Sequence, residues 1–181
     1  RVQGDAYAGG MGLVAACDIA VAAAGVAFCL SETRLGLIPA TIGPYVVRAM
    51  GESAARRYFL TAERFDAAEA HRIGLVHEVA AAGQLDARIG ALAAALLATS
   101  ASAVAAAKQL VHDVAGRAID DALVADTAER IAQVRASADG REGIAAFLGK
   151  RKPAWVAQAE AMQTAPSAPT GDGADDRSGQ R

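Results

Sequence analysis

Three clustered glycines and one later glutamate are the residues of this chain best suited to chemistry. Gly9, Gly10 and Gly12 stand where an extended segment gives way to an apolar helical run. The first N–H groups of a helix lack internal partners, and glycine lets a ligand approach them, so this junction suits an oxygen that develops negative charge. Glu32 lies in an apolar neighbourhood. Burial raises the pKa of a carboxyl group, which would fit Glu32 for proton transfer near neutral pH.

Each of these features also has a purely structural explanation. Glycines at a strand-to-helix turn often serve tight packing of the backbone. A lone glutamate beside an arginine, as Glu32 is beside Arg34, is often a solvated surface ion pair that contributes little stability. From the residue types alone, both explanations stay open.

Alternating strands and helices must position these residues. Apolar runs separated by turn residues predict the elements from their length and period. The expected strands are 1–6, 19–22, 26–30 and 75–79, and the expected helices are 9–18, 40–50, 52–60 and 66–72. Asp66 should cap the last of these helices and Gly74 should stop it. This alternation predicts an α/β fold rather than an all-helical bundle.

Beyond residue 84 the pattern predicts helices alone. Their apolar periodicity places them at 85–98, 102–114, 119–136 and 142–149, followed by a stop at Pro153. Residues 158–181 show no periodic pattern and are rich in Pro, Gly, Ser, Thr and Asp. Such a segment cannot bury enough apolar surface to offset the entropy of ordering, so we predict a disordered tail.

Composition narrows the class of protein. The chain has 181 residues, 53% of them hydrophobic, and a net charge of -2 without a basic tract, which predicts about one domain and no nucleic-acid partner. Cys17 and Cys29 lie in apolar runs and are expected to be buried free thiols of a reducing compartment. The Ala-rich run 89–111 is interrupted by polar residues and no signal peptide is visible, so we expect a cytoplasmic protein without membrane partners.

Four stretches of the chain resemble, in order and spacing, the enoyl-CoA hydratase/isomerase (crotonase) superfamily. They are A-G-G-M-G-L-V-A-A-C-D-I-A-V-A, S-E-T-R-L-G-L-I-P, F-L-T-A-E-R-F-D-A-A-E-A-H-R-I-G-L-V-H-E-V and E-G-I-A-A-F-L-G-K-R-K-P-A-W. The resemblance implies a crotonase (ClpP-like) ββα spiral core, of which residues 1–80 form the C-terminal part only. A helical oligomerisation region, 81–157, and the tail, 158–181, would follow.

The resemblance begins partway through the family's fold, so we expect a fragment of a longer protein. The part that precedes it in the family supplies a second backbone N–H for the thioester oxygen and much of the CoA pocket. Residues 1–80 would then hold half of the active site. On this basis the fragment alone is expected to be poorly active or inactive.

The same resemblance assigns roles to single residues. Gly9 matches the glycine whose N–H polarises the CoA thioester carbonyl, and Glu32 matches the acid that exchanges a proton with substrate carbon. The family's first glutamate, which helps to activate water in hydratases, falls at Gly12 and is missing. Substrate contacts are expected from Gly10, Pro39, Ala40, Phe147 and Lys150, the last two at the nucleotide end of the CoA site. Core packing for Phe147 and a solvated helix end for Lys150 are the alternatives.

Taken together, these features predict an enoyl-CoA hydratase that acts on an acyl-CoA thioester. The sequence of residues 29–61 resembles that of methylglutaconyl-CoA and isohexenylglutaconyl-CoA hydratases. A single Glu32 would also suffice for a Δ3,Δ2-enoyl-CoA isomerase, and an inactive acyl-CoA-binding or oligomerisation fragment is a third possibility. A dinucleotide-binding domain is disfavoured because the glycines do not form G-x-G-x-x-G. No metal or separate cofactor is expected, since coenzyme A is part of the substrate. Family likeness implies a homotrimer or hexamer.

Overall fold

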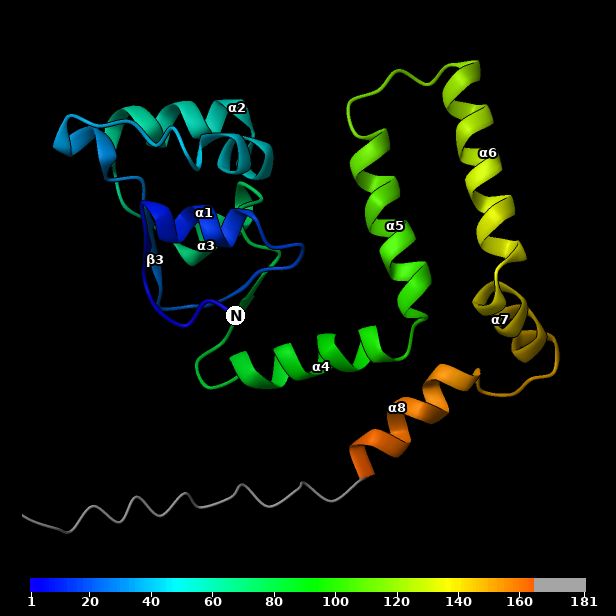
Figure 1. Cartoon of the computed structure of the whole chain (residues 1–181). Coiled ribbons are helices and arrows are strands. Elements are labelled where there is room, and N and C mark those ends of the chain that lie inside the picture. Colours follow the sequence, from blue (N-terminus) through cyan, green and yellow to red (C-terminus); the bar gives the residue numbers. More distant parts are fainter. Residues whose placement is uncertain (165–181) are drawn as a thin grey trace, which may run out of the picture. The chain divides into compact units, whose positions relative to one another are not determined.

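A computed structural model describes residues 1–164, which divide into a first unit of residues 1–94 and a second unit from residue 95 onward (Figure 1). The two units are described separately. The first unit holds every strand that the structure describes, and the second is helical. Strands therefore end where the periodic pattern predicts that they end.

Two small sheets organise the first unit. In one, β1 (Ala6–Tyr7) pairs in parallel with β3 (Ala27–Cys29), which pairs antiparallel with β4 (Phe65–Asp66). In the other, β2 (Val21–Ala23) pairs in parallel with β5 (Glu78–Ala80). The predicted strand 1–6 is reduced to β1 and an isolated bridge between Val2 and Ala22. The strand predicted at 75–79 begins later, because the N–H groups of Leu75 and Val76 donate to the Ala70 carbonyl in the turn that follows α3.

Three helices and one 3-10 turn cover these sheets. They are α1 (Gly9–Ala15), η1 (Glu32–Leu35), α2 (Gly43–Thr61) and α3 (Ala67–Arg72). The α2 segment is broken at Gly51, whose φ of 76° and ψ of 160° are not helical, so the predicted pair of helices is confirmed. The core between sheets and helices contains Met11, Phe28, Leu30 and Val46.

The short helix α3 shows how local sequence sets the element boundaries. The Asp66 side chain accepts a hydrogen bond from the Glu69 N–H at 2.8 Å, as the N-cap prediction requires. Gly74 ends the segment with a φ of 83°, a left-handed conformation that favours glycine. The Glu69 side chain does not complete a capping box, because it binds Tyr58 and Arg72 instead.

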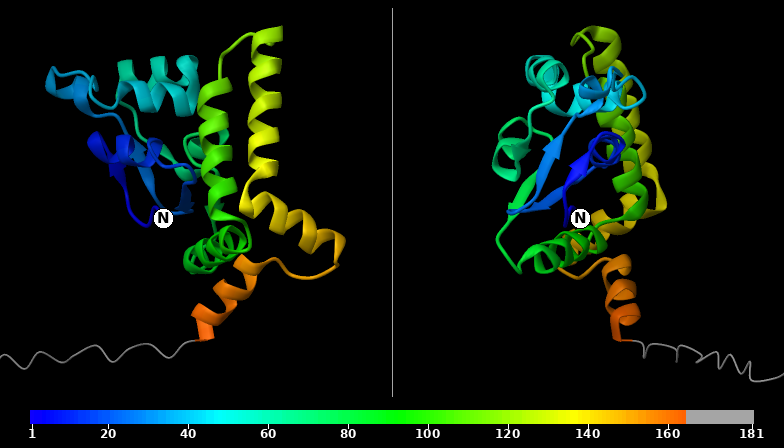
Figure 2. Two further views of the ribbon diagram at one scale, coloured as in Figure 1. Left: turned by 45° about the vertical axis from the view of Figure 1, so that its right-hand side comes forward. Right: turned by 90° about the vertical axis from the view of Figure 1, so that its left-hand side faces the viewer.

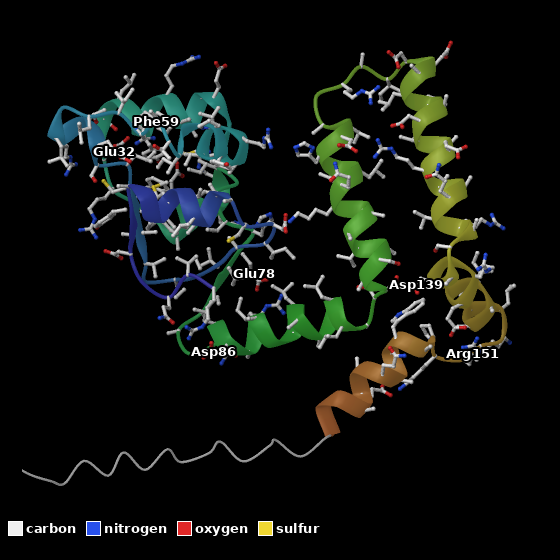
Figure 3. The ribbon with its side chains drawn as sticks, viewed as in Figure 1. Glu32, Phe59, Glu78, Asp86, Asp139 and Arg151 are labelled. Atoms are coloured by element: carbon white, nitrogen blue, oxygen red, sulfur yellow. The ribbon has the colours of Figure 1, made fainter. Side chains whose placement is uncertain are left out.

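Five helices follow, all close to the predicted bounds where a prediction was made. They are α4 (Leu85–Leu97), which crosses the boundary at residue 94, α5 (Ala101–Val114), α6 (Asp121–Ala136), α7 (Ala138–Leu148) and α8 (Ala154–Thr164). Helices α5 and α6 run side by side (Figure 2). Ser100 and Ser102 both donate to Asp139 Oδ2 at 2.6 Å, which ties the starts of α5 and α7 together (Figure 3).

The expected start of the tail at residue 158 is too early, because α8 continues to Thr164. Its sequence, A-W-V-A-Q-A-E-A-M-Q-T, consists largely of good helix formers. Its beginning is also anchored, since Glu142 accepts from the Ala154 N–H at 2.9 Å and the Trp155 Nε1 donates to the Ala98 carbonyl at 3.3 Å. The remainder of the predicted tail, 165–181, lies outside the described residues.

The structure bears on two expectations from composition, the burial of both cysteines and the absence of a membrane span. Cys29 is buried, but Cys17 is exposed, because α1 ends at Ala15 and Cys17 lies on the turn that follows. In the part of the chain that the structure describes, no single helix is long and apolar enough to cross a membrane. Within the same residues, α4 and α5 have that length and apolar character only when taken together, across a bend of 103°.

Candidate active site

The candidate site lies where the chain leaves two neighbouring parallel strands. Tyr7 of β1 is in register with Cys29 of β3, so the carboxyl ends of both strands meet at one edge of the sheet. The Ala8 N–H donates to the Cys29 carbonyl at 3.0 Å and continues this pairing past the strands. Gly9 follows β1 and Glu32 follows β3, so both lie at this edge, where α1 begins and Glu32 is labelled (Figure 3).

The N–H groups of Gly9 and Gly10 are open to a ligand. Gly9 is the exposed first residue of α1, and within residues 1–164 no acceptor takes the N–H of Gly9 or of Gly10. A Cβ built on Gly9 would meet no atom within 4 Å, so there is free space beside this backbone. Two adjacent unpaired donors next to open space can bind an oxygen that carries partial negative charge.

Ala8 holds this turn in an unfavourable conformation. Its φ of 46° and ψ of −119° lie in a region that favours glycine. Two backbone hydrogen bonds keep it there, from the Ala8 N–H to Cys29 and from the Met11 N–H to the Ala8 carbonyl at 2.9 Å. Since ψ of Ala8 sets the plane of the Ala8–Gly9 peptide, this strained residue directs the Gly9 N–H. Strain of this kind is common at functional sites.

Glu32 presents an acid without a partner. Its side chain is half-buried, and its Oε2 is buried without any hydrogen-bond partner in the described chain. Leaving such an atom unsatisfied costs about 1–3 kcal/mol. Arg34 is exposed, and the structure of residues 1–164 contains no Glu32–Arg34 ion pair, so the surface ion-pair explanation is wrong. The carboxyl group is therefore available to a bound molecule.

The apolar surroundings of Glu32 are buried on one side only. Phe28, Cys29 and Leu30 before it belong to the buried part of the unit, as expected. After it, Leu35, Leu37 and Ile38 are exposed, so the expectation of a fully buried neighbourhood is wrong on this side. Leu35 is the last residue of η1, and Leu37 and Ile38 lie on the loop between η1 and α2, where their side chains face solvent.

This loop is tied back to the residues on either side of it. The Leu37 N–H donates to the Glu32 carbonyl at 3.0 Å, and the Gly43 N–H donates to the Pro39 carbonyl at 2.8 Å. Pro39 is buried and Ala40 is exposed. The structure thus places both of these predicted substrate-contact residues on the segment that joins Glu32 to α2. Contact with substrate remains a prediction for Gly10, Pro39 and Ala40.

The position of the family's first glutamate has no room for a side chain. Gly12 is buried in α1, and a Cβ built on it would lie 2.2 Å from Ile42 Cγ2 and 2.7 Å from Ile42 Cβ. The apolar side chain of Ile42 therefore fills the space that a carboxylate at position 12 would need. Nothing in the local pattern around Ile42 signals this contact, because it joins residues far apart in the chain.

The other two predicted substrate contacts lie in the second unit. Phe147 in α7 is 82% exposed, so core packing within this chain is wrong as its explanation. Lys150 is also exposed, with a φ of 51°, and its N–H donates to the Phe147 carbonyl at 3.2 Å. Both side chains are free to meet a ligand or another chain, and their contact with CoA remains a prediction.

A separate pocket of the first unit, about 690 Å³ in volume, is lined by ion-paired residues. It contains Arg57, Arg64, Arg72, Tyr58 and Glu69, and neither Gly9 nor Glu32 borders it. Its three arginines pair with Glu63, Asp5 and Glu69 respectively. Since every cation in the lining already has a carboxylate partner, the pocket is a stabilising charge cluster and not a convergent reactive site.

Tyr58, Glu69 and Arg72 form the centre of this cluster. The Tyr58 hydroxyl donates to Glu69 Oε1 at 2.7 Å, and Arg72 donates to both Glu69 oxygens at 2.5 and 2.7 Å. Burial, and then the bond to Glu69, raise the pKa of Tyr58 to about 12. The hydrogen bonds from Arg72 and Tyr58 lower the pKa of Glu69 to about 2. These residues join α2 to α3.

Comparison with known proteins shows the family. The Enoyl-CoA hydratase/isomerase family profile matches residues 1–158. The chain is 34% identical over 156 residues to enoyl-CoA hydratase domain-containing protein 3, mitochondrial, of Xenopus laevis, covering 86% of this chain and 53% of the relative.

Solved structures agree in fold. A protein of Legionella pneumophila assigned as enoyl CoA hydratase/isomerase (crotonase) has a TM-score of 0.81 and 47% identity over 84% of this chain and 59% of its own. An enoyl-CoA hydratase from Shewanella pealeana has a TM-score of 0.80 and 47% identity, over 84% of this chain and 57% of the Shewanella chain. The chain thus spans 53–59% of these relatives' lengths, and the predicted crotonase α/β fold is confirmed. It belongs to the enoyl-CoA hydratase/isomerase (crotonase) family.

Proposed function

We propose that this chain carries half of the active site of an enoyl-CoA hydratase, which adds water across the 2,3 double bond of an acyl-CoA thioester. One observation carries the proposal: the unpaired N–H of Gly9 and the unpartnered Oε2 of Glu32 lie at the same edge of the sheet. The first group can bind a thioester oxygen and the second can exchange a proton with carbon. Most of the similar proteins carry the words enoyl-CoA hydratase in their names, which supports this reaction.

The chemistry needs one oxyanion donor and one carboxyl group from this chain. The Gly9 N–H donates to the thioester carbonyl oxygen and stabilises the negative charge that this oxygen gains when the double bond is attacked. One oxygen of a protonated Glu32 gives its proton to C2, while the other oxygen takes a proton from the water that adds to C3. Glu32 ends in its starting protonation state, so a single acid balances the reaction.

The substrate is proposed to be a branched, carboxylated enoyl-CoA such as 3-methylglutaconyl-CoA. The wording of residues 29–61 supports this choice, since it resembles hydratases of that class. Coenzyme A enters as part of the substrate, and no metal or further cofactor is included in the proposal. Two cysteines without a disulfide support a cytoplasmic location.

Assembly into a homotrimer or hexamer is also proposed. The second unit exposes large apolar side chains along several of its helices, and buries few in return. Ile131 in α6 is 65% exposed and Leu148 in α7 74% exposed, and Ile119, on the connection between α5 and α6, is 90% exposed. Apolar surface of this extent is typical of a face that another chain covers. Size-exclusion chromatography with light scattering would report the oligomeric state.

A Δ3,Δ2-enoyl-CoA isomerase is the second candidate, and one observation favours it. Position 12 is a glycine, and Ile42 fills the space that a side chain there would need, so within residues 1–164 Glu32 is the carboxylate that the family resemblance places at this site. Moving a proton between two carbons needs one base, whereas hydratases of this family use a second glutamate to hold water. The contact between Gly12 and Ile42 therefore supports the isomerase in addition to the missing glutamate, which the sequence already indicates.

The deciding assay offers the full-length protein three substrates: crotonyl-CoA, 3-methylglutaconyl-CoA and a 3-enoyl-CoA. Hydration of either 2-enoyl substrate is the expected result. It is monitored as the loss of absorbance of the conjugated thioester. Isomerisation of the 3-enoyl-CoA without hydration would replace the hydratase by the isomerase. If residues 1–181 alone turn over neither crotonyl-CoA nor 3-methylglutaconyl-CoA even at high enzyme concentration, this fragment acts as an acyl-CoA-binding or oligomerisation piece.

A further inference from the structure

The contact between Gly12 and Ile42 cannot be relieved by a change of rotamer. A Cβ on Gly12 would lie 2.7 Å from Ile42 Cβ as well as 2.2 Å from Cγ2. The position of Ile42 Cβ is fixed by the backbone, and real Cβ atoms do not approach other atoms so closely. Ile42 is also the N-cap residue of α2, so its backbone is held by the helix: the N–H groups of Tyr45 and Val46 donate to its carbonyl.

Ile42 joins the two elements that carry Gly9 and Glu32. Gly12 is one helical turn after Gly9 and therefore shares its face of α1. The loop that ends at Ile42 starts at Glu32 and is bonded to it through the Leu37 N–H. Helix α1 packs on α2, and η1 packs on α2 as well. Ile42 thus links the two groups, Gly9 and Glu32, to which the hydratase proposal assigns the chemistry.

We propose that Ile42 is a specificity-determining residue of this site. Its methyl groups close the Gly12 face of α1, so that no second carboxylate can enter and no polar group holds water there. Within residues 1–164, the unpartnered Oε2 of Glu32 is then the acid/base atom offered to a substrate held at Gly9. This inference rests on the proposed function for the role of Glu32, and adds the residue that makes the site a one-acid site.

Two pairs of variants in the full-length protein test the contact. Gly12→Ala alone should lower the melting temperature and cut turnover at least tenfold, because the added methyl collides with Ile42. Gly12→Ala combined with Ile42→Gly should recover most of both losses, since the second change removes both colliding atoms, Cγ2 and Cβ. Wild-type stability and turnover in Gly12→Ala alone would overturn the inference, and so would a double variant that is no better than the single one.

A second comparison tests specificity. Ile42→Gly combined with Gly12→Glu opens the space and adds a carboxylate, and Ile42→Gly with Gly12→Gln is its uncharged control. The ratio of hydration to isomerisation should rise at least tenfold in the Glu variant and stay near that of Ile42→Gly in the Gln control. Equal ratios in the two well-folded variants would refute the role of Ile42. Full activity of Glu32→Gln would instead refute the proposed function, so the two failures are distinguishable.

Discussion

Two glutamates of the first unit differ in how their carboxyl groups are satisfied. Glu69 accepts three hydrogen bonds, one from Tyr58 and two from Arg72, and its pKa falls to about 2. Glu32 has a buried Oε2 with no partner anywhere in residues 1–164. Both residues belong to elements connected to α2. Glu32 begins η1, which packs on α2, and Glu69 lies in α3, which is bonded to α2 through Tyr58. The difference separates an acid that holds the fold together from one that is left open for a ligand.

Replacing Glu32 should have the largest effect on turnover of the changes considered for this comparison. Glu32→Gln keeps the shape of the side chain but removes its proton transfer, so turnover should fall by about 10²–10⁴-fold. The free energy of unfolding should change by less than about 1 kcal/mol, because Oε2 makes no hydrogen bond in the described chain. Steady-state kinetics and urea unfolding measure the two quantities. A variant that stays active would show that the acid lies elsewhere.

The second prediction removes the proposed oxyanion donor. Gly9→Pro deletes the N–H at the first position of α1, where a helix loses no internal hydrogen bond, so turnover should fall by about 10²–10³-fold. Gly9→Ala is the matched control, since it keeps the N–H and its Cβ meets no atom within 4 Å. Circular dichroism checks that both variants fold. Equal turnover in the two would remove Gly9 from the mechanism.

The third prediction reverses the pattern at Glu69. Glu69→Gln should leave turnover within about twofold of wild type but lower the free energy of unfolding by roughly 1–2 kcal/mol, because charge-assisted hydrogen bonds to Arg72 are lost. Urea unfolding at neutral pH measures this loss. If Glu69→Gln abolished turnover while Glu32→Gln did not, the two glutamates would have been assigned the wrong way round.

Acid titration sharpens the contrast further. The pKa of Glu69 is lowered from 4.5 to about 2, so its stabilising contribution is fully present above about pH 4.5 and is lost as the pH falls toward 2. The difference in unfolding free energy between wild type and Glu69→Gln should therefore be constant at neutral pH and shrink across this window. A difference that stays constant down to pH 2 would contradict the assigned pKa.

The smallest expected effect concerns strain at the Glu32 edge of the sheet. Ala8→Gly should raise the free energy of unfolding by up to about 1 kcal/mol, because glycine adopts the observed positive φ without steric cost. Thermal unfolding can detect such a shift in a domain of this size. Ala62, which also has a positive φ but follows the C-terminal end of α2, provides a comparison variant, Ala62→Gly. A loss of stability in Ala8→Gly alone would mean that Ala8 is not strained.

Local signals predict much of this fold. The N-cap at Asp66 and the helix break at Gly51 depend on residues within one turn of each other, and both are confirmed. Strand bounds are predicted less well, because pairing in β1 and β5 depends on partners distant in sequence. The resemblance to the family pointed to the glycines and to Glu32, whose placement at one edge follows from the parallel register.

What the pattern does not reveal is tertiary contact. Ile42 lies against Gly12 because α1 packs on α2, which begins directly after Ile42, and no local period encodes that approach. The exposure of Cys17 and the length of α8 have similar causes, since each depends on where a neighbouring segment ends or anchors. The carboxyl group of Glu32 is likewise open only because Arg34 turns to solvent and not toward it.

A crystal structure of the full-length protein with a bound, unreactive acyl-CoA analogue tests the central claim most directly. The account predicts that the thioester oxygen lies about 2.7–3.1 Å from the Gly9 nitrogen and that a Glu32 carboxyl oxygen lies within about 3.5 Å of C2 of the acyl chain. An acyl group bound away from Gly9, or a Glu32 side chain that points away from C2, would contradict it.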